Sequence, residues 1–329
     1  APANGGGTLA ESEASGGGLV GVNATISEAK NVTNVTSFVG DDSILRITGD
    51  LKVLAEGNST QKADSTAITA GVVAVGSNSS LASSNSTISA HLGQGVAIEG
   101  GTVSISAQGR DDNYAESTAG SGGVVAGTAA NAATSSRGGA RAWIGQDVEA
   151  DASSLELKAE HTVDFNAKTD STSASLLGAS GASTDNTVNY TVEASIDDDS
   201  KIEGENLGIL AINRVIKDWV QGHNVQSGSG GVVDAAAVQS KTMINADTKV
   251  TLGENVLLAV VGDRKNPGAL VIEGFSDLRA RDRVKLDAGG AISVALAESK
   301  IQSARNTILQ IGKNSTLTSV GDLDLSVWN

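Results

Sequence analysis

The stretch SGGVVAGTAANAATSSRGGARAWIGQDVEADASSLELKA, residues 121–159, decides the fold, because its parts recur along the chain. Its first mark is a run of small residues that enters an apolar pair. Successive pairs are separated by steps of 53, 52, 52, 56 and 59 positions. The pairs are Leu19-Val20, Val72-Val73, Val124-Val125, Leu176-Leu177, Val232-Val233 and Ala291-Ile292.

A second mark, an apolar residue followed by a tight-turn position, keeps the same five steps. The turn positions are Gly40, Gly93, Gly145, Asp197, Gly253 and Gly312. A third mark, an alternating strand such as Leu155 to Leu157, follows the turn by ten or eleven positions in five of the units. Two independent marks that agree in step indicate six degenerate copies of one unit. Self-similarity of this kind is typical of stacked repeat folds.

Composition favours an all-β solenoid, and we predict a parallel β-helix. Helical repeats would need apolar stripes at i, i+3 and i+4, whereas Gly, Ser, Thr, Asn and Val dominate this chain. Aromatic residues make up only 2%, which suits a narrow interior of small and β-branched side chains. Each unit is long for one coil, so we expect two coils of about 26 residues in each unit. A dozen such coils at ~4.8 Å each would form a rod on the order of 60 Å long.

One elongated domain is expected over residues 16–329, after a lead-in or truncated coil at residues 1–15. We expect the natural chain to continue at both ends, because neither end resembles a polar cap. Insertions near 213–226 and 262–288 depart from the repeat, and insertions in a solenoid often carry partner contacts. They supply the candidate contacts Trp219, Arg279, Arg281 and Arg283. The alternation of LRARDRVKL equally fits an outward basic strand face.

Alternation next to the second mark assigns the two faces of that strand. Positions such as Ala142 and Ile144 are small or apolar in every unit and are predicted to face inward. The column between them is chemically arbitrary and is predicted to face outward. It consists of Phe38, His91, Trp143, Ser195, Thr251 and Gln310. Phe38, His91 and Trp143 would then form a sparse stripe, with rings about 10 Å apart, that contacts a glycan or a neighbouring fibre. The competing interpretation is three isolated rings on the coil surface.

Charge and cysteine content exclude several classes of partner and site. The formal net charge is −15, which would repel DNA and RNA, so no nucleic-acid partner is expected. Cysteine is absent, which excludes disulfides, thiolate catalysis and zinc sites built on Cys. No apolar run approaches the ~20 residues that a membrane-spanning helix needs, so we expect no membrane span.

An enzyme is the main rival, because parallel β-helices also host polysaccharide lyases and hydrolases. Such enzymes need clustered carboxylates on an exposed face. Here the acidic pairs Asp41-Asp42 and Asp111-Asp112 and the run of residues 197–199 fall at or near expected turns, where side-chain bonding to the backbone explains them. We predict no catalytic residue, no cofactor site and no dedicated metal site. Weak Ca²⁺ binding at these turns stays open.

The three histidines carry no metal or catalytic signature. His91, His161 and His223 each lack a second His at metal-ligand spacing, and no Ser lies in a strand-to-helix elbow. We therefore expect all three histidines at the surface.

The repeat resembles a known family in three motifs. They are the Gly-Gly-Val-Val entry, the Ala-x-Ile-Gly turn at Ala142 to Gly145, and the Leu-x-Leu-x-Ala exit at Leu155 to Ala159. Over residues 16–329 the chain resembles large bacterial filamentous adhesins of the leukotoxin type and, more broadly, filamentous-haemagglutinin-like exoproteins. The resemblance implies a right-handed parallel β-helix, an outer-membrane secretion partner, and an extracellular or bacterial cell-surface location.

The resemblance also implies a role in attachment, aggregation or biofilm matrix formation. On that basis we predict a rigid, non-enzymatic stalk or repeat segment of a secreted bacterial surface adhesin. The expected partners are host or matrix glycans, or other copies of the fibre. The alternative is a β-helical protein that binds or cleaves polysaccharide.

Overall fold

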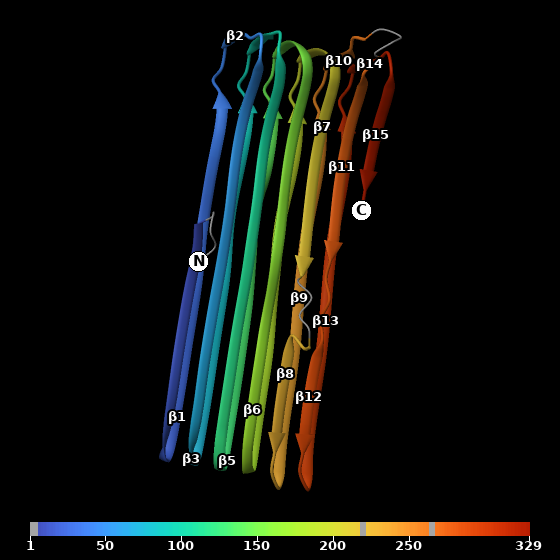
Figure 1. The fold of residues 1–329 in the computed structure, drawn as a ribbon. Coiled ribbons are helices and arrows are strands. Elements are labelled where there is room, and N and C mark those ends of the chain that lie inside the picture. Colours follow the sequence, from blue (N-terminus) through green and yellow to red (C-terminus); the bar gives the residue numbers. More distant parts are fainter. Residues whose placement is uncertain (1–5, 218–221, 263–266) are drawn as a thin grey trace.

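A computed structural model describes residues 6–217, 222–262 and 267–329, and strands dominate these ranges. All fifteen strands belong to one parallel sheet that winds into a β-helix (Figure 1), which confirms the predicted fold class. The strands are β1 (Gly6–Val39), β2 (Ile44–Arg46), β3 (Asp50–Leu92), β4 (Ala97–Glu99), β5 (Thr102–Ile144), β6 (Glu149–Ile196), β7 (Lys201–Lys217), β8 (Val225–Gly230), β9 (Val233–Leu252), β10 (Leu257–Val260), β11 (Ala269–Arg279), β12 (Val284–Gly289), β13 (Ile292–Ile311), β14 (Thr316–Ser319) and β15 (Asp322–Trp328).

The pairing register reproduces the repeat read from the sequence. Gly6 of β1 pairs with Ser59 of β3, a step of 53, and the ladders of the later coils keep the predicted steps of 52, 52, 56 and 59 positions. Each ladder therefore joins residues one whole unit apart. The predicted division of each unit into two coils is wrong, because no ladder in the described ranges joins residues half a unit apart. Each unit is a single, strongly flattened coil.

Every full coil consists of two long legs that face each other. One leg runs from the turn end to a corner at the first mark, and the other runs back (Figure 1). The hydroxyls of Ser65 and Ser80, on opposite legs of β3, lie 2.7 Å apart across the interior. A leg of about 20 residues is ~65 Å long, whereas six coils stack to only ~25 Å. The described part of the chain is thus a slab, longest along its strands, and not the expected rod.

The interior changes character along the legs. Near the turn end it is a continuous apolar core of Val, Ile and Leu, with Leu92, Ile144 and Ile196 at most 1% exposed. Towards the corner it narrows to a ladder of small side chains, such as Ala63, Ala115 and their neighbours. Small residues let the two layers of legs approach each other closely. The low aromatic content therefore matches a thin, two-layered interior.

The predicted faces of the strand before the turn are correct for most positions. Ala142 and Ile144 are fully buried, and Phe38, His91 and Trp143 point outward. Ser195 was expected outside but is only 3% exposed. Its small side chain lies in the same column between its ladder partners, the larger Trp143 and Thr251.

Left-handed turns close each coil at the end opposite the corner. The turn position has a positive φ in all six units, and Asp or Asn tolerates this conformation better than other side chains do. The column is Asp42, Gly95, Asp147, Asp199, Asn255 and Asn314. The carboxylate of Asp41 also accepts the backbone N–H of Gln94 in the next coil, at 2.9 Å. The acidic runs at 41–42 and 197–199 are therefore turn residues, as predicted.

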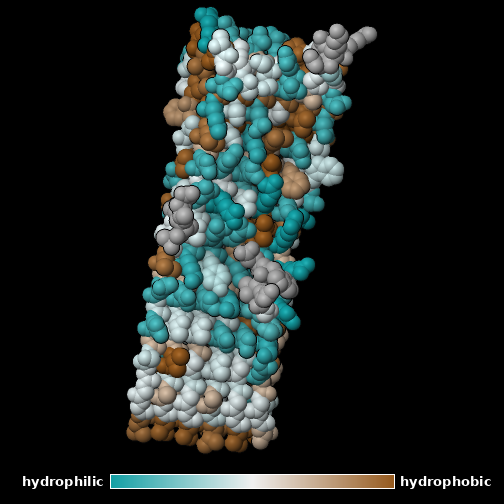
Figure 2. Space-filling view, in the orientation of Figure 1, coloured by the Kyte–Doolittle hydropathy of each residue, from teal (hydrophilic) through white to brown (hydrophobic). Residues whose placement is uncertain are grey.

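The corners need glycine because successive coils approach closely there. A Cβ at Gly71, Gly123, Gly231 or Gly290 would press against the carbonyl oxygen of the matching residue in the preceding coil. The apolar pairs that follow these glycines form a row along the corner edge, visible as the brown band at the lower end in Figure 2. The first mark of the repeat therefore lies at the corner of each coil.

We expect Gly123→Ala to lower the free energy of unfolding by about 1–2 kcal/mol, because the added methyl overlaps the carbonyl of Gly71. Gly127→Ala is the matched control four residues later, where a Cβ would meet nothing within 4 Å. It should be neutral or slightly stabilising. Urea unfolding curves of both variants measure the difference, and equal midpoints would contradict the close-approach argument.

The first described residues and the two insertions can be placed relative to the strands. β1 is already paired at Gly6, so residues 6–15 belong to a truncated coil. The insertion near 213–226 covers the end of β7 and the start of β8. Residues 218–221, including Trp219, are outside the described ranges. The second insertion begins between β10 and β11, which both pair with β7. Ladder partners are 56 positions apart in the β10–β7 ladder and 63 positions apart in the β11–β7 ladder. Within the described ranges there is no helix long and apolar enough to cross a membrane.

Candidate functional site

Three aromatic rings from successive coils form one stack near the turn end. Phe38, His91 and Trp143 are the penultimate residues of β1, β3 and β5. The ring centroids of Phe38 and His91 are 5.2 Å apart with planes 8° from parallel, and those of His91 and Trp143 are 3.8 Å apart at 9°. The expected spacing of about 10 Å is wrong, because each unit is one coil and neighbouring rings are one strand spacing apart. The rings are a continuous stack and not isolated.

Charged groups border the Trp143 end of the stack. The guanidinium carbon of Arg141 lies 4.6 Å from the centre of the Trp143 ring, a cation–π distance. The Nε atom of Arg141 is 3.7 Å from a carboxylate oxygen of Glu193, the next residue in its column. A cation, an anion and an aromatic ring are therefore presented together on the outer face.

A shallow depression lies beside these groups. It is lined by Thr87, Gly138, Gly139, Thr191 and residues of the stack border. Gly139 has no room for a side chain, since a Cβ would overlap the carbonyl of Thr191. The two glycines keep the floor of the depression flat, so a flat ligand ring can approach the backbone there.

His91 in the middle of the stack is held neutral at ordinary pH. Burial between the flanking rings lowers the pKa of His91, and the nearby charge of Arg141 lowers it further, against an opposing effect of Asp41. A neutral imidazole stacks on Trp143 without the desolvation cost of a cation. The stack is therefore an apolar, π-rich strip at neutral pH.

The basic candidates of the second insertion lie elsewhere. Arg279 ends β11 and pairs with Asp277, with 2.9 Å between nitrogen and oxygen. Arg281 and Arg283 follow it in the segment between β11 and β12, and all three arginines are exposed. Residues 280–283 are not in a strand, so the expected outward strand face is not formed there. They lie on the coil of β11, which pairs with β7 and β15, and the stack lies on β1, β3 and β5. The structure does not bring the arginines and the rings together.

A buried polar cluster was missed by the sequence analysis. Asp111 and His161 are fully buried within β5 and β6, so the expected turn position of the first and surface position of the second are wrong. The alternation that buries Val103 and Ile105 continues to Asp111, and that of Leu155 continues to His161. Extending the period-2 pattern beyond the third mark was the signal that could have found them.

Asp111 is the hub of this cluster. Its carboxylate accepts hydrogen bonds from the hydroxyls of Ser59, Ser86 and Tyr190, the second of these at 2.7 Å. The imidazole of His161 packs on the Tyr190 ring with centroids 4.4 Å apart, and its Nε2 is 3.4 Å from the carboxylate. Gly109 makes room for the imidazole, because a Cβ there would overlap it.

The cluster shifts two acid–base equilibria. Burial by itself raises the pKa of Asp111, but the adjacent His161 and the donors Ser59 and Tyr190 outweigh burial and hold the pKa of that carboxyl below its usual value. Burial and the adjacent carboxylate raise the pKa of the Tyr190 hydroxyl well above its usual value. An ionised carboxylate with neutral hydroxyl donors is therefore the favoured arrangement.

A second buried charge pair ties the two insertions together. The ammonium of Lys217, at the end of β7, is 2.7 Å from a carboxylate oxygen of Asp282, and both side chains are at most 1% exposed. Two residues of β9 complete the group, since Ser240 donates a hydrogen bond to Asp282 and Thr242 accepts one from Lys217. Burial lowers the pKa of Lys217, while the charge of Asp282 opposes that effect.

Neither buried group is open to a ligand, and the outer face carries the only aromatic stack in the ranges the structure describes. In those same ranges no three His, Cys, Asp or Glu side chains come together as a metal site would require. Comparisons with protein-family models, curated proteins and solved structures found no match to this chain.

Proposed function

We propose that this chain is a rigid, non-enzymatic display segment of a secreted bacterial surface adhesin, and that its aromatic stack contacts carbohydrate. The observation that carries the proposal is the stack of Phe38, His91 and Trp143 beside Arg141 and Glu193. Aromatic surface bordered by charged hydrogen-bonding groups suits a sugar, which has apolar C–H faces and polar edges.

Rigidity supports the display role. The ladders between β1, β3, β5 and β6 continue along nearly their whole length, so the legs are held at every residue pair. The side chains of the aromatic stack lose little conformational entropy when a ligand binds, because stacking already orders them. The stack is thus preorganised by the fold.

Binding is favoured over cleavage by where the acid–base groups lie. The acid–base pair of the buried cluster, Asp111 and Tyr190, whose pKa values are shifted in opposite directions, is at most 2% exposed inside the coil. A polysaccharide cannot reach them without unfolding the legs. The proposal therefore takes a host or matrix glycan as ligand and keeps polysaccharide cleavage as the alternative to be tested.

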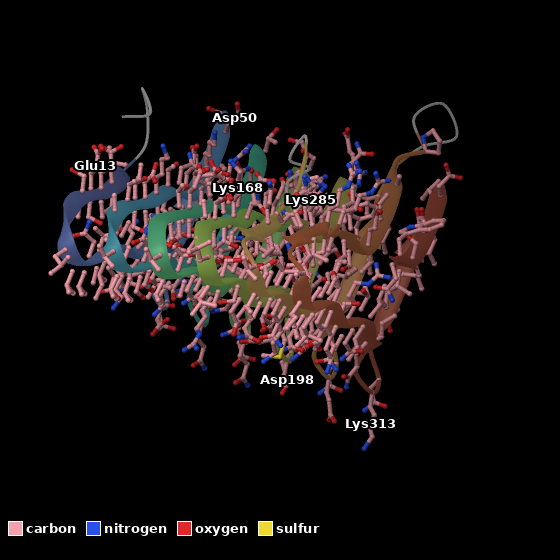
Figure 3. The ribbon with its side chains drawn as sticks, turned by 90° about the horizontal axis from the view of Figure 1, so that it is seen from below. Glu13, Asp50, Lys168, Asp198, Lys285 and Lys313 are labelled. Carbon is pink, nitrogen blue, oxygen red and sulfur yellow. The ribbon has the colours of Figure 1, made fainter. Side chains whose placement is uncertain are left out.

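The charged side chains form a coat around the slab. Figure 3 shows Glu13, Asp50, Lys168 and Lys285 on one side of the coil stack and Asp198 and Lys313 on the other. With a net charge of −15, the coat keeps separate molecules soluble. Weak Ca²⁺ binding at the acidic turns would bridge such coats and promote aggregation. Export through an outer-membrane partner to the cell surface completes the proposal.

The test is a glycan array probed with the whole chain and with Trp143→Ala. We expect the wild type to bind a restricted set of glycans and the variant to lose about tenfold in affinity, because half of the π-rich strip is removed. Trp328→Ala is the matched control, since Trp328 is an exposed tryptophan at the end of β15, outside the stack. It should bind as the wild type does.

Four results would count against the proposal or one of its parts. The wild type could capture no glycan, or Trp143→Ala could bind unchanged while keeping the wild-type circular dichroism spectrum. New reducing ends in polysaccharide incubated with the chain would establish the cleaving alternative. Aggregation that a chelator leaves unchanged would remove the role of Ca²⁺.

A further inference from the structure

The corner edge carries a row of exposed aliphatic side chains that the proposed function does not use. In the four inner coils these side chains are 36–55% exposed although the coils on both sides are present. We call this row the corner ridge. It consists of Leu19, Val20, Val72, Val73, Val124, Val125, Leu176, Leu177, Val232, Val233 and Ile292. Figure 2 shows it as an unbroken band along the end of the slab, below a pale zone of weakly polar residues. Contiguous apolar patches of this kind usually mark a contact surface.

The legs next to the corner ridge carry no charge over a long distance. In three inner coils residues 65–84, 117–136 and 171–184 contain no Asp, Glu, Lys or Arg. Asp234, which follows the ridge in the next coil, faces inward, where it accepts hydrogen bonds from Ser229 and from the backbone of Gly289. The nearest charges on the fourth coil, Asp170 and Asp185, are six and eight residues from the ridge pair, or ~20 Å and ~26 Å of strand.

The backbone at the corner is already satisfied. The N–H of Val232 donates to the carbonyl of Leu176 at 2.9 Å, and the N–H of Ile292 donates to that of Val232 at 3.0 Å. A partner that covers the ridge therefore leaves no unpaired backbone donor at these positions, and covering costs little polar desolvation.

From these observations we infer that the corner ridge is a self-association surface, and that its occupant is the corner ridge of a second copy of this chain. In both ridges, equivalent side chains of successive coils are ~4.8 Å apart. The side chains of one copy therefore interdigitate with those of the other along the whole row. A two-fold axis across the ridge makes the contact isologous, with the first coil of one copy against the last coil of the other.

Charge and area support a second copy. The net charge of −15 would keep two copies apart in most orientations, but ridge-to-ridge contact holds the exposed flanking charges more than a Debye length of ~8 Å from the contact. A corner ridge ~25 Å long and ~20 Å wide buries ~500 Å² per copy, near the lower limit for a specific interface. The dimer should therefore be weak and concentration-dependent. The inference goes beyond the proposed function, because the ridge lies at the opposite end of the legs from the aromatic stack.

The test is sedimentation velocity of the whole chain over a concentration series up to about 0.1 mM, where a small interface associates. The ridge variant is Val125→Lys with Leu177→Lys, two ladder partners of β5 and β6 whose exposed side chains tolerate substitution. The control is Thr102→Lys with Ser154→Lys, ladder partners of the same two strands at the other end of the legs. Both variants add the same charge.

We expect the wild type and the control to dimerise and the ridge variant to show a dissociation constant at least about tenfold higher. A wild type that stays monomeric over the whole series, or a ridge variant that dimerises as the wild type does, would overturn the inference. If the monomeric wild type instead floats with neutral phosphatidylcholine vesicles and the ridge variant does not, the ridge binds lipid and not a second copy. Each of these results leaves the glycan-array test of the aromatic stack unaffected.

Discussion

Lys217→Met is expected to lower the free energy of unfolding by about 3–5 kcal/mol, because it leaves the buried carboxylate of Asp282 without its cation. The double variant Lys217→Met with Asp282→Leu should recover most of this loss, since an apolar pair of similar volume removes both buried charges. Urea unfolding followed by circular dichroism measures the stabilities, and hydrogen exchange of the β7 and β8 amides localises the change.

The matched control for this pair is Lys285→Met. Lys285 and Asp287 form an ion pair of nearly the same length, 2.6 Å, but their side chains are 40% and 58% exposed. Exposed pairs are worth at most about 1 kcal/mol, so the control should unfold close to the wild type. Equal losses of unfolding free energy in Lys217→Met and Lys285→Met would show that the buried pair stabilises the fold no more than the exposed pair does.

Asp111→Asn is expected to cost about 3 kcal/mol at neutral pH, because the buried carboxylate accepts hydrogen bonds at both oxygens. Ser59 and Ser86 donate to one oxygen and Tyr190 donates to the other. An amide has one acceptor oxygen and places an N–H₂ group against a donor, so at least one buried hydroxyl loses its partner. Asp112→Asn is the control, because Asp112 is the neighbouring, partly exposed residue that pairs with Arg110. It should change stability by less than about 0.5 kcal/mol, as urea unfolding of both variants would show.

The cost of Asp111→Asn should also depend on pH in a defined direction. The pKa of Asp111 is lower in the folded protein than in the unfolded chain. Its contribution is therefore complete above the unfolded value of about 3.9 and is lost as the pH falls through the folded value. The stability difference between wild type and Asp111→Asn should be constant near neutral pH and shrink in acid. A difference that grows in acid would refute the assignment of an ionised Asp111.

The repeat step was predictable from the sequence, but the shape of the coil was not. The steps between Leu19, Val72 and Val124 match the ladder register of the structure. Both one flattened coil and two smaller coils keep the same alternation of inward and outward residues. What separates them is whether Val72-Val73 lies within a strand or at a corner, and that depends on which distant segments pair. Local periodicity contains no such information.

The candidate sites also differ in whether the periodic sequence pattern could predict them. The column of Phe38, His91 and Trp143 was found because it repeats with the unit, and only the ring spacing was wrong, as a result of the coil number. The Asp111 cluster followed an alternation that could have been extended. Lys217 and Asp282 lie 65 residues apart in two insertions outside the repeat, so no periodic signal links them. Their pairing is purely tertiary.

The register of the ladders has a consequence for how the chain reaches its native state. Every ladder within the described ranges joins residues at least 52 positions apart, so a single coil there has no partner strand of its own. Bringing the first two coils together must overcome the chain entropy of closing a loop of that length before any ladder stabilises it. Each later coil then adds to an edge that already exists. Nucleation is the slow event, and growth proceeds by templated addition, one whole unit at a time.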